Sequence, residues 1–446
     1  MTTKAQGYSI IEKLPEAFVL RTKLLLGEKW EAFEQALNTE SPTSIRLNPK
    51  KMSFEHYCEQ SEVVAEKVSW ASDAYYLSSR PSFTLDPLFH AGCYYVQEAS
   101  SMFLEQIIKK HITGKVKVLD LCAAPGGKST QLSSVLPEES LLVANEVIHS
   151  RSYILAENLI KWGNANTIIT NNDPATIGKL TSFFDIIVAD VPCSGEGMFR
   201  KDPASIGEWS LQNVQLCSER QRRIIADIWS ALAPGGLLVY STCTYNREEN
   251  EENIEWMCRE LGAEIIEEPH RFMPHQTKGE GFFIAAVRKA GEKKEKQNKR
   301  GATKQSDTMA NWLTNPYDFT FLSENTISIA IPSVHLEDYK QLKSQLKIVS
   351  AGIALGETKG RDFIPAHALA VSNSLSLSAF PTLELDKETA LKYLKKEALQ
   401  TLPPDLPRGH ILVTYLHHPL GFVKNIGNRA NNLYPQEWRI RMNIPA

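Results

Sequence analysis

Short apolar runs alternate with longer helix-like segments along residues 91–289, and this alternation is the strongest constraint on the fold. Apolar runs with the composition of strands occupy residues 116–121, 141–147, 166–170, 184–189 and 237–240. Strands that alternate with helices favour a parallel sheet with flanking helices. The carboxyl ends of parallel strands meet at one edge, where open α/β sheets bind ligands. The sequence therefore predicts an α/β domain with a ligand site at that edge.

The regions on either side are predicted to be separate units. Residues 1–90 favour a small N-terminal α/β domain. Residues 290–311 have no apolar periodicity, and from Glu292 to Lys304 they hold six basic side chains against two acidic ones. Such a segment is typical of a solvated linker. Residues 312–446 mix short strands and helices and form the predicted C-terminal region.

Three local patterns predict individual helices. Residues 15–37 favour one amphipathic helix in the N-terminal domain. A helix over 213–232 is expected to end at the turn Ala-Pro-Gly-Gly over 233–236. Asn246 is expected to cap a helix whose first turn is rich in acidic residues, as the helix dipole favours.

Composition excludes several classes of protein. The chain has 446 residues, a net charge of −3 and 42% hydrophobic residues, which is typical of a globular protein. No run approaches the ~20 apolar residues of a membrane span, and the first residues lack the apolar core of a signal peptide. The seven cysteines lack the spacing of a disulfide framework or a zinc site. We expect a cytoplasmic monomer with free thiols, no metal and no membrane partner.

Two cysteines follow apolar runs directly. Cys193 stands in Asp-Val-Pro-Cys after residues 184–189, and Cys243 stands in Ser-Thr-Cys-Thr after residues 237–240. If both runs are strands of one parallel sheet, both thiols face one pocket. Two thiols in a pocket suit covalent catalysis, in which one attacks and the other assists. Taken singly, each cysteine is more often a small buried core residue than a functional one.

The segment after the first strand has the composition of a ligand-binding turn. Residues 120–128 read Asp-Leu-Cys-Ala-Ala-Pro-Gly-Gly-Lys, and their small side chains let the backbone approach a ligand. The spacing matches neither GxGxxG nor GxxxxGK[ST], which argues against dinucleotide and triphosphate binding. Acidic residues recur near the strand ends, at Asp120, Glu146, Asp173 and Asp190. Several carboxylates without a phosphate cradle suit S-adenosylmethionine, which has a ribose, an adenine and a sulfonium but no phosphate.

These two features fit methylation of carbon 5 of cytosine. That carbon is too weakly nucleophilic to take a methyl group until a thiolate adds at carbon 6 of the ring. The route then needs a nucleophilic cysteine, a group near ring nitrogen 3, and help with elimination of the enzyme thiol.

Three motifs resemble the Sun/Fmu-type RNA cytosine-C5 methyltransferases. They are LCAAPGGKS (121–129), DVPCSGEGMFRKD (190–202) and YSTCTYNREENEENI (240–254). The long form SGEGMFRKD, together with YYVQEASSM (94–102) and the additional C-terminal region, is more similar to the RsmF branch, which acts on small-subunit ribosomal RNA. The resemblance implies a Rossmann-like S-adenosylmethionine-dependent methyltransferase sheet and a PUA-like RNA-binding module near residues 390–446.

The resemblance also implies the roles of individual residues. Cys243 is the expected nucleophile, Cys193 the thiol that helps to release the product, and Asp190 the group between cofactor and cytosine. The residues alone do not decide which thiol attacks, because DNA cytosine methyltransferases use the cysteine of the Pro-Cys motif. The implied cofactor contacts are Cys122, Ala123, Ala124, Pro125, Gly126, Gly127, Lys128, Glu146, Asp173 and Asp190.

Basic residues near the catalytic motifs and in the C-terminal region are candidate RNA contacts. Arg200 and Lys201 follow the first cysteine motif and are expected to meet phosphates. The linker 290–311 is either a plain spacer or a basic segment that touches RNA. In the C-terminal region basic and aromatic residues are interleaved, which suits RNA with splayed bases. They are Lys424, Arg429, Arg439, Arg441, Phe422, Tyr434 and Trp438.

Three functions remain open from the sequence. The leading prediction is methylation of cytosine in small-subunit ribosomal RNA, free or within an assembling subunit. The same chemistry on transfer RNA is the alternative, because the motifs define the base and not the RNA that carries it. A methyltransferase-like RNA-binding assembly factor without turnover is the third, and Cys193, Cys243 and Asp190 argue against it because binding alone needs no thiol.

Overall fold

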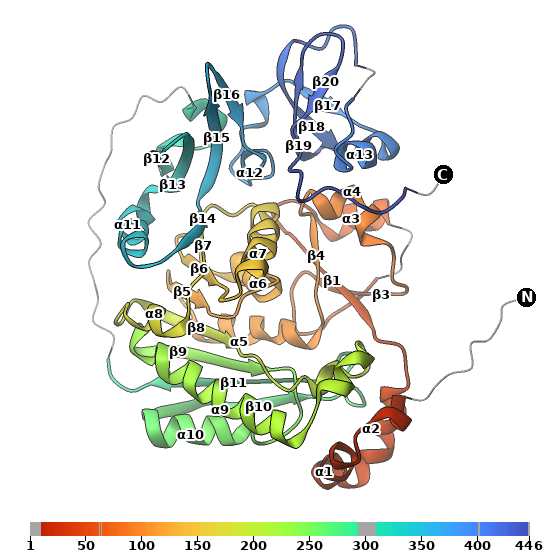
Figure 1. Ribbon diagram of the computed structural model, residues 1–446, viewed down its shortest axis with the longest axis vertical. Coiled ribbons are helices and arrows are strands. Elements are labelled where there is room, and N and C mark those ends of the chain that lie inside the picture. Colours follow the sequence, from red (N-terminus) through yellow and green to blue (C-terminus); the bar gives the residue numbers. More distant parts are fainter. Residues whose placement is uncertain (1–9, 62, 64, 293–308, 400–401, 445–446) are drawn as a thin grey trace, which may run out of the picture.

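The computed structural model describes residues 10–61, 63, 65–292, 309–399 and 402–444. At its centre lies an eight-stranded sheet in the order β10-β11-β9-β8-β5-β6-β7-β14 (Figure 1). Five neighbouring strands are parallel, as the alternation predicts. They are β5 (Lys117–Asp120), β6 (Leu141–Asn145), β7 (Thr167–Thr170), β8 (Phe184–Asp190) and β9 (Leu232–Thr242).

The chain runs outward from β5 to β6 and β7 on one side, and β8 and β9 lie on the other. The strand order therefore reverses between β5 and β8. Ligands of open α/β sheets bind outside the carboxyl ends of the strands at such a reversal. The topology thus brings the segments that follow β5, β8 and β9 to one site.

Antiparallel strands complete both edges of this sheet. β11 (Phe282–Lys289) pairs with β9, and β10 (Ala263–Phe272) pairs with β11. On the other edge β14 (Ile348–Ala351) pairs with β7. The sequence analysis did not predict that β14, which follows the linker, belongs to this sheet. Only the fold shows that β7 would otherwise be an open edge with unpaired backbone groups.

Helices cover the central sheet. Along the chain they are α5 (Leu104–His111), α6 (Gly127–Val135), α7 (His149–Trp162), α8 (Pro174–Gly178), α9 (Leu211–Ile228), α10 (Glu251–Leu261) and α11 (Leu336–Gln345). The turn predicted at 233–236 is a bulge within β9: the pairing with β8 passes from Leu232 directly to Leu237, and Gly235 has φ +72°. Asn246 does not cap α10, which begins at Glu251 after Asn250.

The N-terminal region forms a second sheet in the order β2-β3-β1-β4. Its strands are β1 (Thr43–Leu47), β2 (Ala65–Lys67), β3 (Ala74–Leu77) and β4 (Tyr94–Val96), and its helices are α1 (Glu16–Leu26), α2 (Trp30–Leu37), α3 (Phe54–Gln60) and α4 (Pro87–His90). The single helix predicted over 15–37 is two helices, separated by a 3-10 turn at Gly27–Lys29. The break lets Phe18 of α1 and Phe33 of α2 both enter one buried cluster with Tyr245.

The C-terminal region contains two further four-stranded sheets. The first has β12 (Phe319–Glu324), β13 (Ile327–Pro332), β15 (Ile353–Lys359) and β16 (Asp362–Pro365), with α12 (His367–Ala370) beside it. The second has β17 (Thr382–Glu384), β18 (Gly409–Tyr415), β19 (His418–Asn425) and β20 (Ala430–Asn432), with α13 (Lys387–Leu394). This second sheet shares a hydrophobic core with the N-terminal region, whose helices α3 and α4 lie against it (Figure 1).

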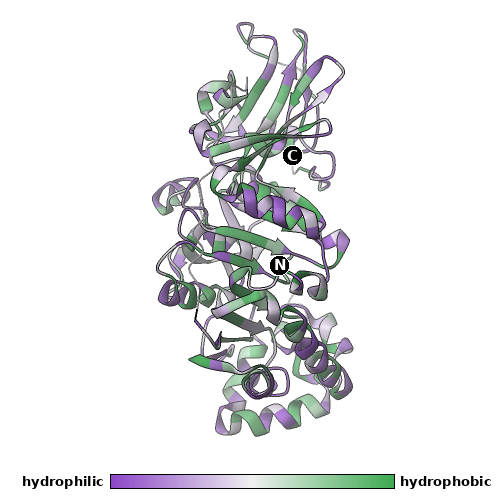
Figure 2. Ribbon diagram, turned by 90° about the vertical axis from the view of Figure 1, so that its left-hand side faces the viewer, coloured by the Kyte–Doolittle hydropathy of each residue, from purple (hydrophilic) through white to green (hydrophobic). Residues whose placement is uncertain are grey.

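Strands in the interior are largely hydrophobic, while the helices carry hydrophilic residues on part of their surface (Figure 2). This pattern is expected of helices that bury one face on a sheet. Among the described residues, no helix is long and apolar enough to cross a membrane. Most of the predicted linker, residues 293–308, lies outside the described residues.

Candidate active site

Two loops at the carboxyl ends of β8 and β9 bring Cys193 and Cys243 into contact. Their sulfur atoms are 3.0 Å apart, and the backbone N–H of Cys243 donates to the sulfur of Cys193 at 3.3 Å. Both residues are partly exposed. The two thiols lie side by side, as expected of residues that follow neighbouring parallel strands, and their facing one ligand pocket stays a prediction.

The buried carboxylate of Glu196 joins the two cysteine loops. It lies three residues after Cys193 and accepts hydrogen bonds from the loop after Cys243: from the Thr244 hydroxyl and from the backbone N–H groups of Tyr245 and Asn246, all within 2.9 Å. Its other oxygen accepts from the Trp209 indole at 3.0 Å. The carboxylate thereby fixes the Cys243 loop relative to the Cys193 loop.

Backbone contact between the same loops is equally close. The N–H of Gly197 donates to the Cys243 carbonyl at 2.9 Å. A Cβ atom on Gly197 would lie 2.8 Å from that carbonyl oxygen and 2.4 Å from the Gly281 oxygen, so a side chain at this position would push the loops apart. Glycine in SGEGMF is therefore a requirement of the close approach.

A second buried carboxylate, that of Glu249, holds the segments that follow Cys193 and Cys243. Its carboxylate accepts from the Ser194 N–H at 3.0 Å, from the Gln221 amide at 2.7 Å and from the Asn246 amide at 2.7 Å. Burial raises the pKa of Glu249, and these hydrogen bonds oppose that rise. Asn246, predicted as a helix cap, instead takes part in this network.

Asp190, the last residue of β8, stands beside the thiols. Its carboxylate accepts from Lys128 Nζ and from the Ser241 hydroxyl, each at 2.7 Å. Burial alone would lower the pKa of Lys128, but the adjoining Asp190 carboxylate raises it. The Lys128–Asp190 ion pair therefore connects the turn after β5 with the cysteine loops.

The predicted cofactor turn follows β5 at the reversal point. Gly126 has φ +119°, a left-handed conformation that favours glycine. The carbonyl of Ala124 accepts from Arg151 at 2.7 Å, and that of Pro125 accepts from Asn158 at 2.8 Å, so α7 holds the turn from outside. α6 then begins at Gly127, and its first backbone N–H groups are available to a ligand.

The acidic residues predicted at the strand ends have different environments. Glu146 is buried after β6, accepts from the Ile148 N–H at 2.9 Å and lies 3.7 Å from Arg151. Asp173 is exposed and caps α8, with one oxygen bonded to the Thr176 N–H and the other to its hydroxyl. The Thr176 N–H lowers the pKa of Asp173.

Asp120, at the end of β5, is fully buried. One of its oxygens accepts from the Ser129 hydroxyl at 2.6 Å, and the other has no hydrogen-bond partner. Burial raises the pKa of Asp120 to about 7. An unpaired buried oxygen at the reversal point is an acceptor that a bound ligand can satisfy.

The contact with Cys243 raises the pKa of Cys193, and burial adds to the effect. Cys193 is therefore an uncharged thiol at neutral pH. Burial likewise raises the pKa of Cys122 in the cofactor turn, which keeps that side chain an uncharged thiol.

The structure corrects the expectation for Arg200. Its guanidinium is 6% exposed and pairs with Glu280 at 3.0 Å. It also donates to the Gly279 carbonyl and to the Ala36 carbonyl of α2. Arg200 therefore joins the cysteine loop to the N-terminal helices instead of facing solvent, whereas Lys201 is exposed.

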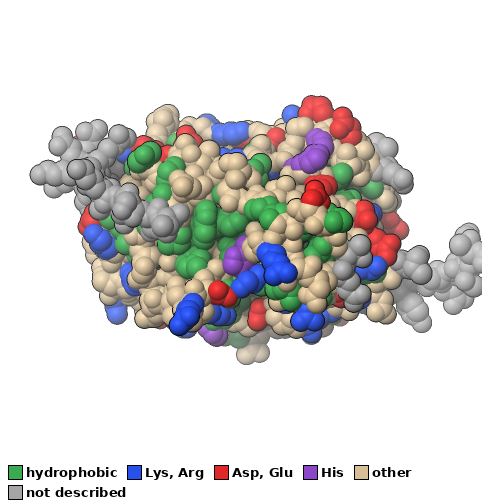
Figure 3. Space-filling model, turned by 90° about the horizontal axis from the view of Figure 1, so that it is seen from above, with side chains coloured by type: hydrophobic (Ala, Val, Ile, Leu, Met, Phe, Trp, Pro, Cys, Tyr) green, Lys and Arg blue, Asp and Glu red, His purple; other side chains and the backbone are tan. Residues whose placement is uncertain are grey.

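The structure also corrects the expectation for two of the interleaved aromatic residues of the C-terminal region, while Trp438 is partly exposed. Phe422 and Tyr434 are buried, at 1% and 0% exposure, because β19 and its neighbours place them in the core. Lys424 pairs with Asp362 at 2.7 Å. The upper face of this region, viewed in Figure 3, nevertheless gathers hydrophobic side chains in its middle with Lys and Arg side chains at the margin.

Comparisons with known proteins place the chain in a family. Residues 109–288 match the family model "16S rRNA methyltransferase RsmB/F", residues 14–99 match the N-terminal domain of 16S rRNA methyltransferase RsmF, and residues 380–440 match the RsmF PUA domain. A ribosomal RNA small subunit methyltransferase F of Vibrio cholerae is 30% identical, over 95% of this chain and 97% of its own length. The chain belongs to the RsmF family.

A second curated relative and two solved structures are also similar to this chain. The enzyme of the same name from Cronobacter sakazakii is 30% identical over 95% of this chain and 96% of its own. A methyltransferase homologue from Pyrococcus horikoshii has a TM-score of 0.55 at 28% identity, and covers 64% of this chain and 99% of its own. NSun6 from the same organism, solved with the S-adenosylmethionine analogue SFG, has a TM-score of 0.56 at 21% identity, over 63% of this chain and 100% of its own.

This RsmF family member is therefore a methyltransferase that uses S-adenosylmethionine. The turn after β5 fits that cofactor: its small residues leave the backbone accessible, and Asp120 offers an unpaired oxygen. Among the described residues, no group of three or more potential ligands could hold a metal ion.

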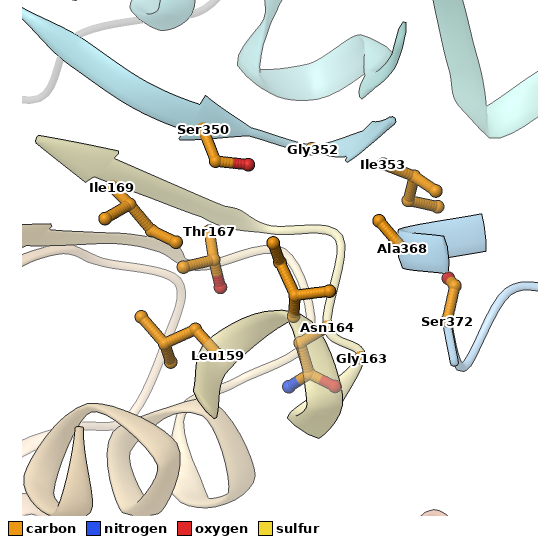
Figure 4. A pocket seen from close by; sticks show the side chains of 11 residues that line it. Leu159, Gly163, Asn164, Thr167, Ile169, Ser350, Gly352, Ile353, Ala368 and Ser372 are labelled. Atoms are coloured by element: carbon orange, nitrogen blue, oxygen red, sulfur yellow. The ribbon is translucent and has the colours of Figure 1, made fainter. Parts of the chain in front are cut away.

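A separate pocket of this RsmF family member lies away from the thiols (Figure 4). It is lined by Leu159 and Asn164 near the end of α7, Thr167 at the start of β7, Ser350 of β14, and Ser372. Because it adjoins the amino end of β7, it lies apart from the strand ends that form the active site.

The sequence analysis missed Glu196 and Glu249 as site residues. Glu196 lies in the motif SGEGMF and Glu249 in the motif NREENEEN, and their place inside these motifs is the signal that could have marked them as site residues. A single glutamate there is equally compatible with an exposed surface charge. Only the tertiary structure shows that both are buried and bonded to the opposite loop.

Proposed function

We propose that this chain methylates carbon 5 of a cytosine in small-subunit ribosomal RNA, through a covalent bond between Cys243 and carbon 6. The observation that carries the proposal is the contact of two partly exposed thiols, 3.0 Å apart, beside the Asp190–Lys128 pair. The relatives named ribosomal RNA small subunit methyltransferase F support the choice of RNA.

We assign the attack to Cys243 because the resemblance to the RNA cytosine-C5 methyltransferases implies it, and Glu196 fixes the loop that follows this partly exposed residue. Formation of the sulfur–carbon bond moves negative charge toward ring nitrogen 3. Nitrogen 3 takes up a proton that neutralises this charge, and we assign Asp190, with the Lys128 ammonium 2.7 Å away, to pass that proton to the ring and to recover it when the adduct collapses.

S-adenosylmethionine supplies an electrophilic methyl group to carbon 5. A base then removes the carbon 5 proton, the double bond re-forms, and Cys243 leaves as a thiolate. Cys193 is protonated and in contact with Cys243, so it can donate a hydrogen bond to the departing sulfur. We therefore assign Cys193 to product release.

The cofactor is assigned to the turn 122–128 together with Glu146 and Asp173. Glu146 is buried at the end of β6, where a carboxylate accepts hydrogen bonds from ribose hydroxyls. Asp173 already bonds both oxygens to Thr176, so its contact with a cofactor must share these acceptors. Asp120 adds an acceptor that the sequence analysis had not assigned to the cofactor.

Alanine substitutions distinguish the roles of the two thiols. Cys243→Ala is expected to lose methyl transfer by more than about a thousandfold, because the covalent step is lost. Cys193→Ala is expected to transfer the methyl group and then stall, so a protein–RNA complex should survive denaturing electrophoresis and disappear after RNase treatment. Cys258→Ala, remote from the site on α10, is the matched control and should behave as the unsubstituted enzyme.

A trapped complex with Cys243→Ala and none with Cys193→Ala would reverse the two roles. Full activity of both variants would refute the two-thiol mechanism. The RNA is identified by bisulfite sequencing of total RNA from cells with and without the gene. Loss of a 5-methylcytosine from small-subunit ribosomal RNA supports the proposal, whereas loss from transfer RNA alone would contradict it.

A further inference from the structure

The N-terminal sheet contacts the cofactor helix through one buried side chain. Arg46 projects from the middle of β1, is 2% exposed, and crosses to α6 of the central domain. Its guanidinium donates to the Thr130 hydroxyl at 2.5 Å and to the Gly127 carbonyl at 3.3 Å. Gly127 and Thr130 are the first and fourth residues of α6, directly after the cofactor turn.

Thr130 continues this contact into the turn itself. Its hydroxyl donates to the carbonyl of Gly126 at 2.8 Å while it accepts from Arg46. Gly126 is the residue with the left-handed conformation, so its carbonyl direction sets the path of the turn. The three residues form a continuous chain of hydrogen bonds from the N-terminal sheet to the cofactor turn.

Contacts with two further side chains also hold the Arg46 guanidinium in place. It donates to the Gln97 side chain at 3.0 Å and lies over the Trp162 ring at 4.6 Å, at the end of α7. It borders a polar cavity of about 230 Å³ that also contains Glu105 and Asp73. Burial lowers the pKa of Arg46 to about 9, and the nearby Glu105 carboxylate opposes this change.

The position of Arg46 is unfavourable for the helix alone. A helix N-terminus carries partial positive charge and is stabilised by anions, so a cation at the first turn of α6 has no advantage for helix stability. Its contacts instead immobilise the turn that must present backbone groups to the cofactor. Binding is tighter when the site is already ordered, because less conformational entropy is lost.

We propose that Arg46 is a positioning residue for S-adenosylmethionine, acting through Thr130 on the backbone of Gly126. The proposal rests on the assignment of the cofactor to the turn 122–128. It gives the N-terminal domain a part in cofactor binding, although that domain supplies none of the residues assigned to the cofactor.

The test measures S-adenosylmethionine affinity by calorimetry in the full-length protein. Arg46→Met and Thr130→Val should each weaken cofactor binding by about tenfold, the effect of losing a hydrogen bond to a charged group. The double variant should be no weaker than either single one, because both break the same chain. Cofactor KM should rise while kcat and RNA affinity change little.

Lys51→Met is the matched control. Lys51 is another cation of the N-terminal region whose ammonium contacts three backbone carbonyls, of Ala91, Lys161 and Val371, and none of them belongs to α6 or the turn. This variant should unfold at a lower temperature and bind the cofactor with unchanged affinity. If it weakens cofactor binding as much as Arg46→Met, the effect is a general loosening and the proposal is overturned.

Two further outcomes overturn the proposal. Thr130→Val retains the shape of threonine and should fold even if Arg46→Met does not. Unchanged cofactor affinity in this variant would show that Arg46 does not act through the Thr130 hydroxyl. Losses that add in the double variant would show that Arg46 and Thr130 act separately. If the unsubstituted chain bound no S-adenosylmethionine, both this proposal and the proposed function would fail, and the first titration would reveal it.

Discussion

The strand ends of the central sheet and the C-terminal sheet contain similar kinds of sequence signal with opposite outcomes. Cys193 and Cys243, which are 50 residues apart in the chain, meet at 3.0 Å. Phe422 and Tyr434, which are interleaved with basic residues in the sequence, are buried in a core. In the first region a functional interpretation agrees with the geometry, and in the second it does not.

The difference follows from what each pattern determines. A residue directly after a parallel strand lies at the carboxyl edge whatever its side chain, so topology alone brings such residues together. An aromatic residue in an antiparallel strand faces either solvent or the core, and a shift of one residue reverses the choice. Composition therefore locates a site well at strand ends and poorly along strands.

The strongest test of this comparison is Phe422→Ala. If Phe422 is a core residue, the substitution should reduce the free energy of unfolding by about 3–5 kcal/mol, because it leaves a cavity. The folded fraction should bind RNA with unchanged affinity. Urea unfolding and filter binding measure the two quantities, and unchanged stability with weakened RNA binding would restore the interpretation of Phe422 as an exposed stacking residue.

Glu196→Gln tests whether the cysteine loops depend on one another. Glu196 accepts hydrogen bonds from four donors, and the substitution places the N–H groups of an amide among them. The free energy of unfolding should therefore fall by about 2–3 kcal/mol. Methyl transfer should fall with it, because the Cys243 loop loses its anchor. Glu219→Gln, on the exposed face of α9, is the control. Equal effects of the two substitutions would contradict the role of Glu196.

Glu146→Ala should weaken S-adenosylmethionine binding by about 1–3 kcal/mol, the cost of losing hydrogen bonds to a charged acceptor. Calorimetry at constant pH measures the change, and circular dichroism checks that the fold is retained. Unchanged affinity would show that the buried carboxylate after β6 supports the Ile148 turn only.

Asp120→Asn should alter the pH dependence of stability. Because burial raises the pKa of Asp120 from 3.8 to about 7, the folded chain holds a proton between these values that the unfolded chain has lost. This group's contribution to stability is therefore present at acid pH and lost as pH rises toward 7. In the variant, the free energy of unfolding should lack this decline with pH, which amounts to at most about 1.4 kcal/mol per pH unit. Identical pH profiles by thermal unfolding would contradict the assignment.

The smallest expected effect separates Arg200 from Lys201. Loss of one phosphate contact reduces the salt slope of RNA binding by about 0.7. Lys201→Ala, at the exposed position, should show this reduction, while Arg200→Met should lower stability and leave the slope unchanged because Arg200 is paired with Glu280. The reverse result would place Arg200, and not Lys201, at the RNA.

The sequence predicted the five parallel strands of the central sheet well and the accessory elements poorly. β5 to β9 follow from alternation, since each strand buries a short apolar run. β14 carries no such signal, because its partner on β7 is 178 residues away, as the pairing of Ile348 with Thr170 shows. The turn expected at 233–236 is an irregularity inside β9, because pairing with β8 resumes at Leu237 and the strand continues beyond it.

The sequence by itself determined the catalytic edge: the strand pattern, the three motifs and the thiols that follow two strands. Tertiary structure alone decided which charges are exposed and which are internal supports. Glu196, Glu249, Arg46 and Arg200 are each bonded to segments distant in the chain. The physical reason is that burial of a charge depends on partners from other elements, and such partners become neighbours only when the chain is folded.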